Sequence, residues 1–235
     1  MKAFFAYLHR IDRTWLVTWG CIYFGFLILG IIVPNFFGIT VLKYSGIVLN
    51  LIYAVQKFPR DHLLQTALFF TLLADTILVL DSTSIVGVFV FCLAQFFHMT
   101  RLSKIRPINL LLYLLLIALL YLFSLTQHIP PIFAVCLVYA GSLLANIIFA
   151  YHWHKKSPGV QSTCGFTGFL LFGACDTCVA LSYLSYIHTL PYFLYAPANY
   201  FAWFFYYPSQ LFIANSSKTT RRQLKSSQST KTVLQ

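Results

Sequence analysis

The stretch LLFGACDTCVALSYL (170–184) is apolar enough to form a helix inside a membrane, yet it carries one carboxylate, Asp176. A charged side chain at the centre of a bilayer costs roughly 2.5–3.5 kcal/mol on insertion scales. Such a residue therefore usually faces the inside of a helix bundle, where it has a partner or a function. The stretch TLLADTILVL (71–80) places Asp75 in similar surroundings, so the chain offers two candidate buried carboxylates.

The composition predicts a multi-pass helical membrane protein. The chain is 59% hydrophobic and 9% charged, with a mean hydropathy of +0.76, whereas about a quarter of the residues of a soluble domain are charged. Several apolar runs reach the roughly 18 residues that a membrane-spanning helix needs. We expect one all-α domain over residues 1–215, with eight transmembrane helices at 15–33, 38–56, 63–80, 84–100, 108–126, 132–151, 165–187 and 197–214.

Two prolines shape the last of these spans. Pro197 suits the first turn of a helix. Pro208 lies inside the span, where it should kink the helix and free a backbone carbonyl that neighbouring helices must satisfy.

The basic residues predict the orientation of the bundle. In an eight-span arrangement, fifteen of the sixteen Lys and Arg residues fall on one side, which the positive-inside rule makes cytosolic. Both termini are then cytosolic, and residues 216–235 form a basic cytosolic tail whose Ser, Thr, Lys and Gln content predicts disorder. We expect the protein to lie in a bacterial cell membrane. Attraction to anionic lipids accounts for the net charge of +11, so no nucleic-acid partner is expected.

The sixteenth basic residue, Lys43, falls about one turn into the second span from the outer side. Its side chain either extends to the outer membrane interface, as long basic side chains do, or faces the interior of the bundle and has a functional role there.

Several classes of mechanism lack their sequence signatures. There is no His-Glu-x-x-His, no Gly-x-Ser-x-Gly, no phosphate-binding glycine loop and no dinucleotide fingerprint. Cys175 and Cys178 have a suggestive spacing, but they flank Asp176 within one helix and have no second pair. We therefore expect no metal and no cofactor.

Spans three–four and seven–eight share a pattern. Asp75 is followed by LAQFF (93–97) and Asp176 by PSQLF (208–212), so each pair of spans carries Asp and then Gln. This repetition predicts two four-helix halves in parallel orientation.

Helical spacing then collects polar residues into faces. Asn199, Trp203, Tyr206 and Gln210 share a stripe of the last span. Each such residue alone is commonly an interhelical hydrogen bond. Together with Asp75, Asp176 and Gln95 they predict a polar cavity near the midplane with aromatic walls, suited to a lipid-like ligand.

At these residues the chain resembles a known family. ALFFTLLADTILVL (67–80), FLLFGACDTCVALSYL (169–184) and WFFYYPSQLFIANS (203–216) are similar, in order and spacing, to the YhhN family of integral membrane proteins. The ending FFYYPSQLFIA (204–214) resembles a subgroup from Gram-positive bacteria. The resemblance covers roughly residues 38–215.

The resemblance implies eight transmembrane helices and lysoplasmalogenase activity, which is hydrolysis of the vinyl-ether bond of a lysoplasmalogen to a fatty aldehyde. By position it makes Asp75 and Asp176 the catalytic residues and Lys43 a further site residue. One departure is visible in span four, where Gln95 and His98 stand in place of the expected His and Tyr.

The residues are compatible with this chemistry on their own. A vinyl ether hydrolyses when a carbon atom is protonated and water captures the resulting oxocarbenium ion, so one carboxylic acid and one carboxylate suffice. We assign Asp176, the deeper residue, as the acid and Asp75, nearer Lys43, as the ionised partner; the reverse assignment stays open at this point. Lys43, Gln95, Asn199, Tyr206 and Gln210 would bind the substrate and orient water.

Two other functions remain open at this point. A transporter of a lipid or amphiphile would also use a parallel repeat with buried carboxylates. A non-catalytic membrane scaffold would use the same Asp residues only to hold helices together. The expected partners are a lysophospholipid or another amphiphilic substrate and the surrounding membrane lipids.

Overall fold

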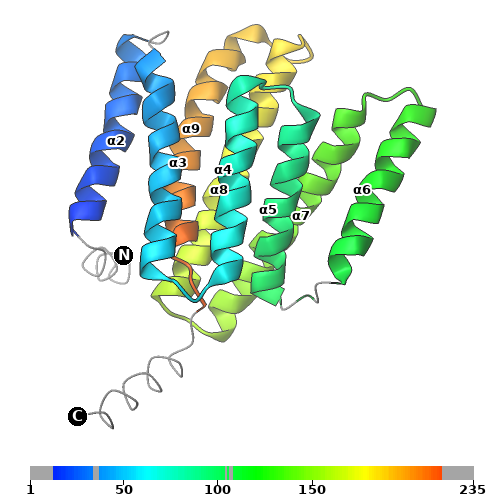
Figure 1. Ribbon diagram of the computed structural model, residues 1–235. Helices are drawn as coiled ribbons and strands as arrows, with labels where there is room; N and C mark the ends of the chain where they lie inside the picture. Colours follow the sequence, from blue (N-terminus) through cyan, green and yellow to red (C-terminus); the bar gives the residue numbers. More distant parts are fainter. Residues whose placement is uncertain (1–12, 34–36, 104, 106–107, 219–235) are drawn as a thin grey trace, which may run out of the picture.

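The computed structural model describes residues 13–33, 37–103, 105 and 108–218 (Figure 1). Within them the chain is all-helical and contains no strand. Its helices are α2 (Arg13–Ile32), α3 (Phe37–Lys57), α4 (His62–Leu80), α5 (Ile85–Ser103), α6 (Asn109–Thr126), α7 (Pro131–Lys156), α8 (Val160–Tyr186), the 3-10 turn η1 (Tyr192–Leu194) and α9 (Tyr195–Ala214).

Among the described residues, the seven helices α2 to α8 are long and apolar enough to cross a membrane. This makes the chain a multi-pass membrane protein. The eighth helix, α9, is 20 residues long but is not among the seven. It carries Asn, Ser, Gln, two prolines and several tyrosines, which lower its hydropathy. It nevertheless packs extensively against α8 inside the bundle (Figure 1).

Helix boundaries follow local chemistry. The side chain of Asp61 accepts a hydrogen bond from the backbone N–H of Leu64 at 3.2 Å and caps the start of α4. Pro131 opens α7 at a position where a missing N–H costs nothing. The last two helices begin earlier than the sequence predicts, α8 at Val160 rather than 165 and α9 at Tyr195 rather than 197. Pro197 thus lies in the first turn of α9.

The helices form one bundle with α2 and α6 at opposite flanks (Figure 1). Helix α4 packs most closely on α5, and α8 on α9. In addition, α5 packs on α7, and α9 packs on α3. If α2–α5 and α6–α9 are taken as two halves, α5 is equivalent to α9 and α7 is equivalent to α3. The α5–α7 contact is therefore equivalent to the α9–α3 contact. That is the pattern expected of parallel halves, and their common origin stays a prediction.

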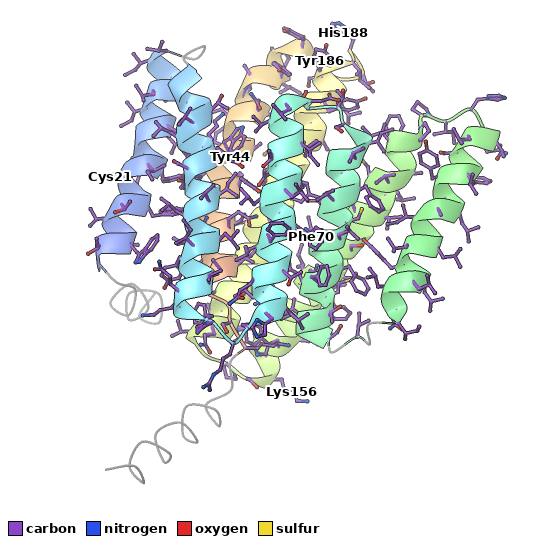
Figure 2. The ribbon with its side chains drawn as sticks, in the orientation of Figure 1. Cys21, Tyr44, Phe70, Lys156, Tyr186 and His188 are labelled. Carbon is purple, nitrogen blue, oxygen red and sulfur yellow. The ribbon has the colours of Figure 1, made fainter. Side chains whose placement is uncertain are left out.

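Basic side chains gather at one end of the bundle. Four basic residues lie at or beside helix ends that meet there (Figure 1): Lys57, Arg60, Arg101 and Lys156. Figure 2 shows Lys156 at this end. Tyr186 and His188 lie at the opposite end (Figure 2). Of the other predicted cytosolic bases, Lys2, Arg10, Lys104, Arg106 and those after Lys218 lie outside the described residues. We call the end that carries Lys156 the basic end.

The chain leaving α9 is tied into the basic end. Buried Arg101 donates from both terminal nitrogens to Ser216, at 2.9 Å to its carbonyl and 3.0 Å to its hydroxyl. Asp61 accepts from the Ser217 hydroxyl at 2.8 Å and from the Lys218 backbone N–H at 3.2 Å. The Lys218 ammonium donates to the carbonyls of Arg101 and Leu102. We call Asp61, Arg101 and Ser216–Lys218 the basic-end lock.

The lock differs from the expectation of a disordered tail that starts at residue 216. Ser216 and Ser217 are fully buried, because they satisfy Arg101 and Asp61 rather than solvent. The rest of the predicted tail, 219–235, lies outside the described residues.

Pro208 lies inside α9 and cannot donate a backbone hydrogen bond to Phe204, one turn earlier. The hydroxyl of Tyr23 on α2 donates to this carbonyl at 3.0 Å. The freed backbone group is thus satisfied by a neighbouring helix, as the sequence predicts.

Candidate active site

Asp75 points into the bundle because it continues the buried stripe of α4. Leu64, Leu68 and Thr71 precede it at helical spacing, and all are buried. The Asp75 side chain is 7% exposed, and its Oδ2 accepts a short hydrogen bond from the hydroxyl of Tyr206 on α9. A carboxyl group taken out of water needs such a partner, and here it comes from a helix far along the chain.

Asp176 on α8 has an equivalent partner from a different helix. The hydroxyl of Tyr139 on α7 donates to its Oδ2 at 2.6 Å. Asp176 is partly exposed, whereas Cys175 beside it is buried. Each of the two carboxyl groups is therefore held by one tyrosine.

The two carboxyl groups belong to one site, because a continuous series of packed aromatic rings connects the two tyrosines that bind them. Tyr206 packs on Phe172 at 5.7 Å between centroids, Phe172 on Phe91 at 6.1 Å, and Phe91 on Tyr139 at 5.7 Å. These residues and the two Asp residues come from α4, α5, α7, α8 and α9. The site therefore lies where helices of the two halves, α2–α5 and α6–α9, meet.

Lys43 lies on α3, and its ammonium lies over the ring of Trp203, 4.3 Å from the centroid. This is the geometry of a cation–π contact. Trp203 in turn packs edge-on against Tyr206 at 5.6 Å. Lys43 is thus oriented toward the interior of the bundle, and two aromatic rings separate it from Asp75. The next residue, Tyr44, ties α3 to α4 through a 2.9 Å hydrogen bond with Thr76 (Figure 2).

Gln95 and Gln210 are both fully buried. Gln95 accepts from the Asn146 amide at 2.8 Å through its side-chain oxygen and at 3.0 Å through its backbone carbonyl. The amide nitrogens of both glutamines have no hydrogen-bond partner among the described residues. Buried donors of this kind normally bind water or a ligand. Gln95 lies one turn from Phe91 and Gln210 one turn from Tyr206, so both are within a turn of the aromatic rings of the site.

Asn199 is the predicted site residue that the structure does not bring to the carboxyl groups. The buried face of α9 runs through Ala198, Ala202 and Tyr206 at intervals of four residues. Asn199 is rotated away from this face and is exposed. The predicted stripe therefore holds for Trp203, Tyr206 and Gln210 but not at its outer end.

Tyr139 is the member of the site whose role sequence reasoning missed. It stands out in the sequence only as one of several polar residues on the sixth span, with Ser142 and Asn146. In the structure these three contact three different helices, since Ser142 bonds Tyr113 on α6 at 2.7 Å and Asn146 bonds α5. The rotation of a helix decides which polar residue meets which partner, and spacing within one helix does not reveal it.

A bundle of apolar helices that holds two tyrosine-bound carboxyl groups between them defines a class of protein, a multi-pass membrane protein with a candidate intramembrane acid–base site. The comparison with family models gives the particular family. The YhhN family model matches residues 38–217, which include Lys43, both Asp residues, both tyrosines and the lock residues up to Ser217. The chain belongs to the YhhN family. Searches of curated proteins and of solved structures found no match.

Proposed function

We propose that the protein is an intramembrane hydrolase of lysolipids that cleaves a vinyl-ether bond. The observation that carries this proposal is the pair of carboxyl groups inside the bundle, each bound by a tyrosine hydroxyl and connected to the other by packed aromatic rings. The YhhN family is associated with lysoplasmalogenase activity, which supports the same substrate class.

The proposed reaction requires one proton donor and one proton acceptor. Asp176, as the acid, transfers its proton to the alkenyl carbon farther from the ether oxygen, and the adjacent carbon becomes an oxocarbenium ion. Asp75, as the carboxylate, takes a proton from the water that attacks this cation. The hemiacetal then collapses: Asp75 gives its proton to the glycerol oxygen as the bond from carbon to that oxygen breaks, and Asp176 takes the hydroxyl proton, which restores both groups. The products are a fatty aldehyde and a glycerophospho-alcohol, and the net reaction consumes one water molecule.

The tyrosines hold the two carboxyl groups in place. The bond from Tyr206 to the ionised Asp75 is charge-assisted, and such bonds are roughly twice as strong as neutral ones. Tyr139 orients the protonated Asp176 through a neutral hydrogen bond. The unpaired amide nitrogens of Gln95 and Gln210 are the best-placed donors for the attacking water or the glycerol hydroxyls. Lys43 supplies the positive charge that a phosphate head group would meet.

We also propose an orientation for the bundle. With α9 as an eighth span, the basic end faces the cytosol and both termini lie there, as the positive-inside rule requires. A bacterial cell membrane remains the expected location.

The test is mass spectrometry of purified protein incubated with a lysoplasmalogen and, separately, with an ordinary lysophospholipid. The wild type should release aldehyde from the lysoplasmalogen, and Asp176→Asn and Asp75→Asn should lower that rate by about 10²–10⁴-fold, as loss of a general acid or base does.

The matched control is Asp81→Asn, because Asp81 is exposed in the turn after α4 and, within the described part of the chain, its carboxylate bonds only to Thr83. It should keep full activity. Intact lipid in every wild-type sample would contradict the proposal. In that case, movement of lipid across vesicles would favour the transporter alternative.

A further inference from the structure

A cavity of about 460 Å³ lies between α5, α6 and α7, outside the candidate active site. Its lining is almost wholly apolar, and it includes Val86, Phe89, Leu114, Ile117, Ala118 and Val135. We call this cavity the α5–α6 groove. Its volume falls within the roughly 300–1,000 Å³ of small-molecule sites.

The groove exists because α6 is attached to the bundle on one side only. Helix α6 packs chiefly on α7 and stands at the flank of the bundle (Figure 1). Most of its leucines are exposed, including Leu112, Leu115 and Leu119. In a membrane these side chains meet lipid, so the groove is open to hydrocarbon and not to water.

Tyr139 joins the groove to the candidate active site. Its ring packs against the cluster formed by Cys92, Ile117, Val135 and Val138, two members of which line the groove. Its hydroxyl donates to Asp176 at 2.6 Å. One side chain thus packs against the cluster that contains Ile117 and Val135 of the groove lining and donates its hydroxyl to the carboxyl group.

We infer that the α5–α6 groove holds the hydrocarbon chain of a single-chain lipid substrate, which enters sideways from the membrane. This inference rests on the proposed function and adds the place and direction of binding. A chain in the groove leads past Tyr139 to Asp176, while the polar head group extends toward Asp75 and Lys43.

This direction of binding also agrees with the proposed roles of the carboxyl groups. In an alkenyl ether the carbon that accepts the proton is on the hydrocarbon side of the oxygen-bearing carbon. Asp176 lies on the groove side of the site through Tyr139, so it is placed to protonate that carbon. Asp75, held from α9 by Tyr206, lies toward the head group and the attacking water.

The test uses Ala118→Phe, which fills the groove from α6. Its matched control is Ala140→Phe, the same change at an exposed position of α7 that does not line the groove. A lysolipid with a photoreactive diazirine in the middle of its chain is bound to each protein in nanodiscs and irradiated. The labelled residues are then read by peptide mass spectrometry.

In the wild type and in Ala140→Phe, label should fall on Phe89, Ile117 or Val135, and unlabelled lysolipid should compete better than diacyl phospholipid. Ala118→Phe should lose this label. Labelling elsewhere, or equal competition by diacyl phospholipid, would overturn the inference, and the latter would make the groove a contact for bulk lipid.

Kinetics separate this inference from the proposed function. Ala118→Phe should lower kcat/KM for long-chain lysoplasmalogen by at least about tenfold, since each buried methylene contributes roughly 0.8 kcal/mol. It should leave short-chain substrates unaffected. Equal effects on both chain lengths would overturn the inference. If the wild type releases no aldehyde at all, the proposed function fails, and the labelling experiment alone decides whether the groove binds a chain.

Discussion

The hydroxyl of Tyr23 on α2 donates to the backbone carbonyl of Phe204 on α9 across 3.0 Å. This carbonyl lacks its usual helical partner because Pro208 follows one turn later. In hydrocarbon an unpaired carbonyl costs several kcal/mol, so the tyrosine makes the proline tolerable. The first described helix is thereby bound to the last one.

A double-mutant cycle tests this relationship. Tyr23→Phe keeps the ring that packs on Trp19 and Tyr207 but leaves the Phe204 carbonyl unpaired, so it should destabilise the fold by about 1–3 kcal/mol. Pro208→Ala restores a backbone N–H that can fill the same carbonyl. In that background Tyr23→Phe should cost much less. Unfolding in detergent measures all four proteins, and an equal cost in both backgrounds would refute the coupling.

The tyrosines that hold the carboxyl groups should matter to catalysis more than to folding. Tyr139→Phe and Tyr206→Phe each remove one hydroxyl and keep the ring. Each should lower kcat for aldehyde release by about 5–150-fold, which corresponds to 1–3 kcal/mol for an unmade buried hydrogen bond. Tyr186→Phe, the same change at an exposed position, is the control and should have wild-type kcat (Figure 2). Wild-type rates in both site variants would show that the hydroxyls only connect helices.

Gly46 allows α3 to approach α9. A Cβ added at Gly46 would overlap the phenol ring of Tyr207. This ring cannot move aside easily, because Trp19, Tyr23 and Phe26 pack around it. Gly46→Ala should therefore lower the free energy of unfolding by about 1–3 kcal/mol.

Gly141→Ala is the control for that substitution, since nothing lies within 4 Å of an added Cβ there. It should be neutral or stabilise the helix by roughly 0.5–1 kcal/mol. Thermal unfolding in detergent checks both variants. Equal midpoints would mean that α3 and α9 are not held as closely as the structure shows.

The basic-end lock depends on the charge of Asp61. This carboxylate caps α4 and accepts two hydrogen bonds from Ser217 and Lys218. Asp61→Asn should destabilise the fold by about 1.5–3 kcal/mol, the usual value for hydrogen bonds to a charged group. Asp81→Asn, in the exposed turn at the other end of α4, should stay within about 0.5 kcal/mol of wild type. Chemical denaturation compares them, and similar losses in both would contradict a special role for the lock.

Much of the fold could be predicted from composition and charge. A membrane helix is long and apolar, so its place in the chain is visible without knowledge of its neighbours. The candidate carboxyl groups were visible for the same reason, because an Asp inside an apolar run is costly. The carbonyl freed by Pro208 could also be predicted, since it follows from the covalent structure of proline.

The partners of these groups could not be predicted. Tyr139 for Asp176, Tyr23 for the Phe204 carbonyl and Ser216 for Arg101 all come from other helices or from the chain after α9. Which helices are neighbours, and how each is rotated, is set by packing of the whole bundle. Asn199 illustrates a second limit. Helical spacing predicts which residues share a stripe of the helix, but it does not predict at which residue the buried part of that stripe ends.

The basic-end lock joins several parts of the chain at one end of the bundle. Separating the helices at that end would break three contacts together. These are the bond from the buried Arg101 guanidinium to Ser216, the bond from Ser217 to the Asp61 carboxylate, and the bond from the Lys218 ammonium to the Arg101 carbonyl. At the flanks, α2 and α6 each have one main neighbour. The bundle is therefore most constrained at the basic end and least constrained at its flanks. Under the proposed function, a substrate and its products would both pass on the lipid-facing side.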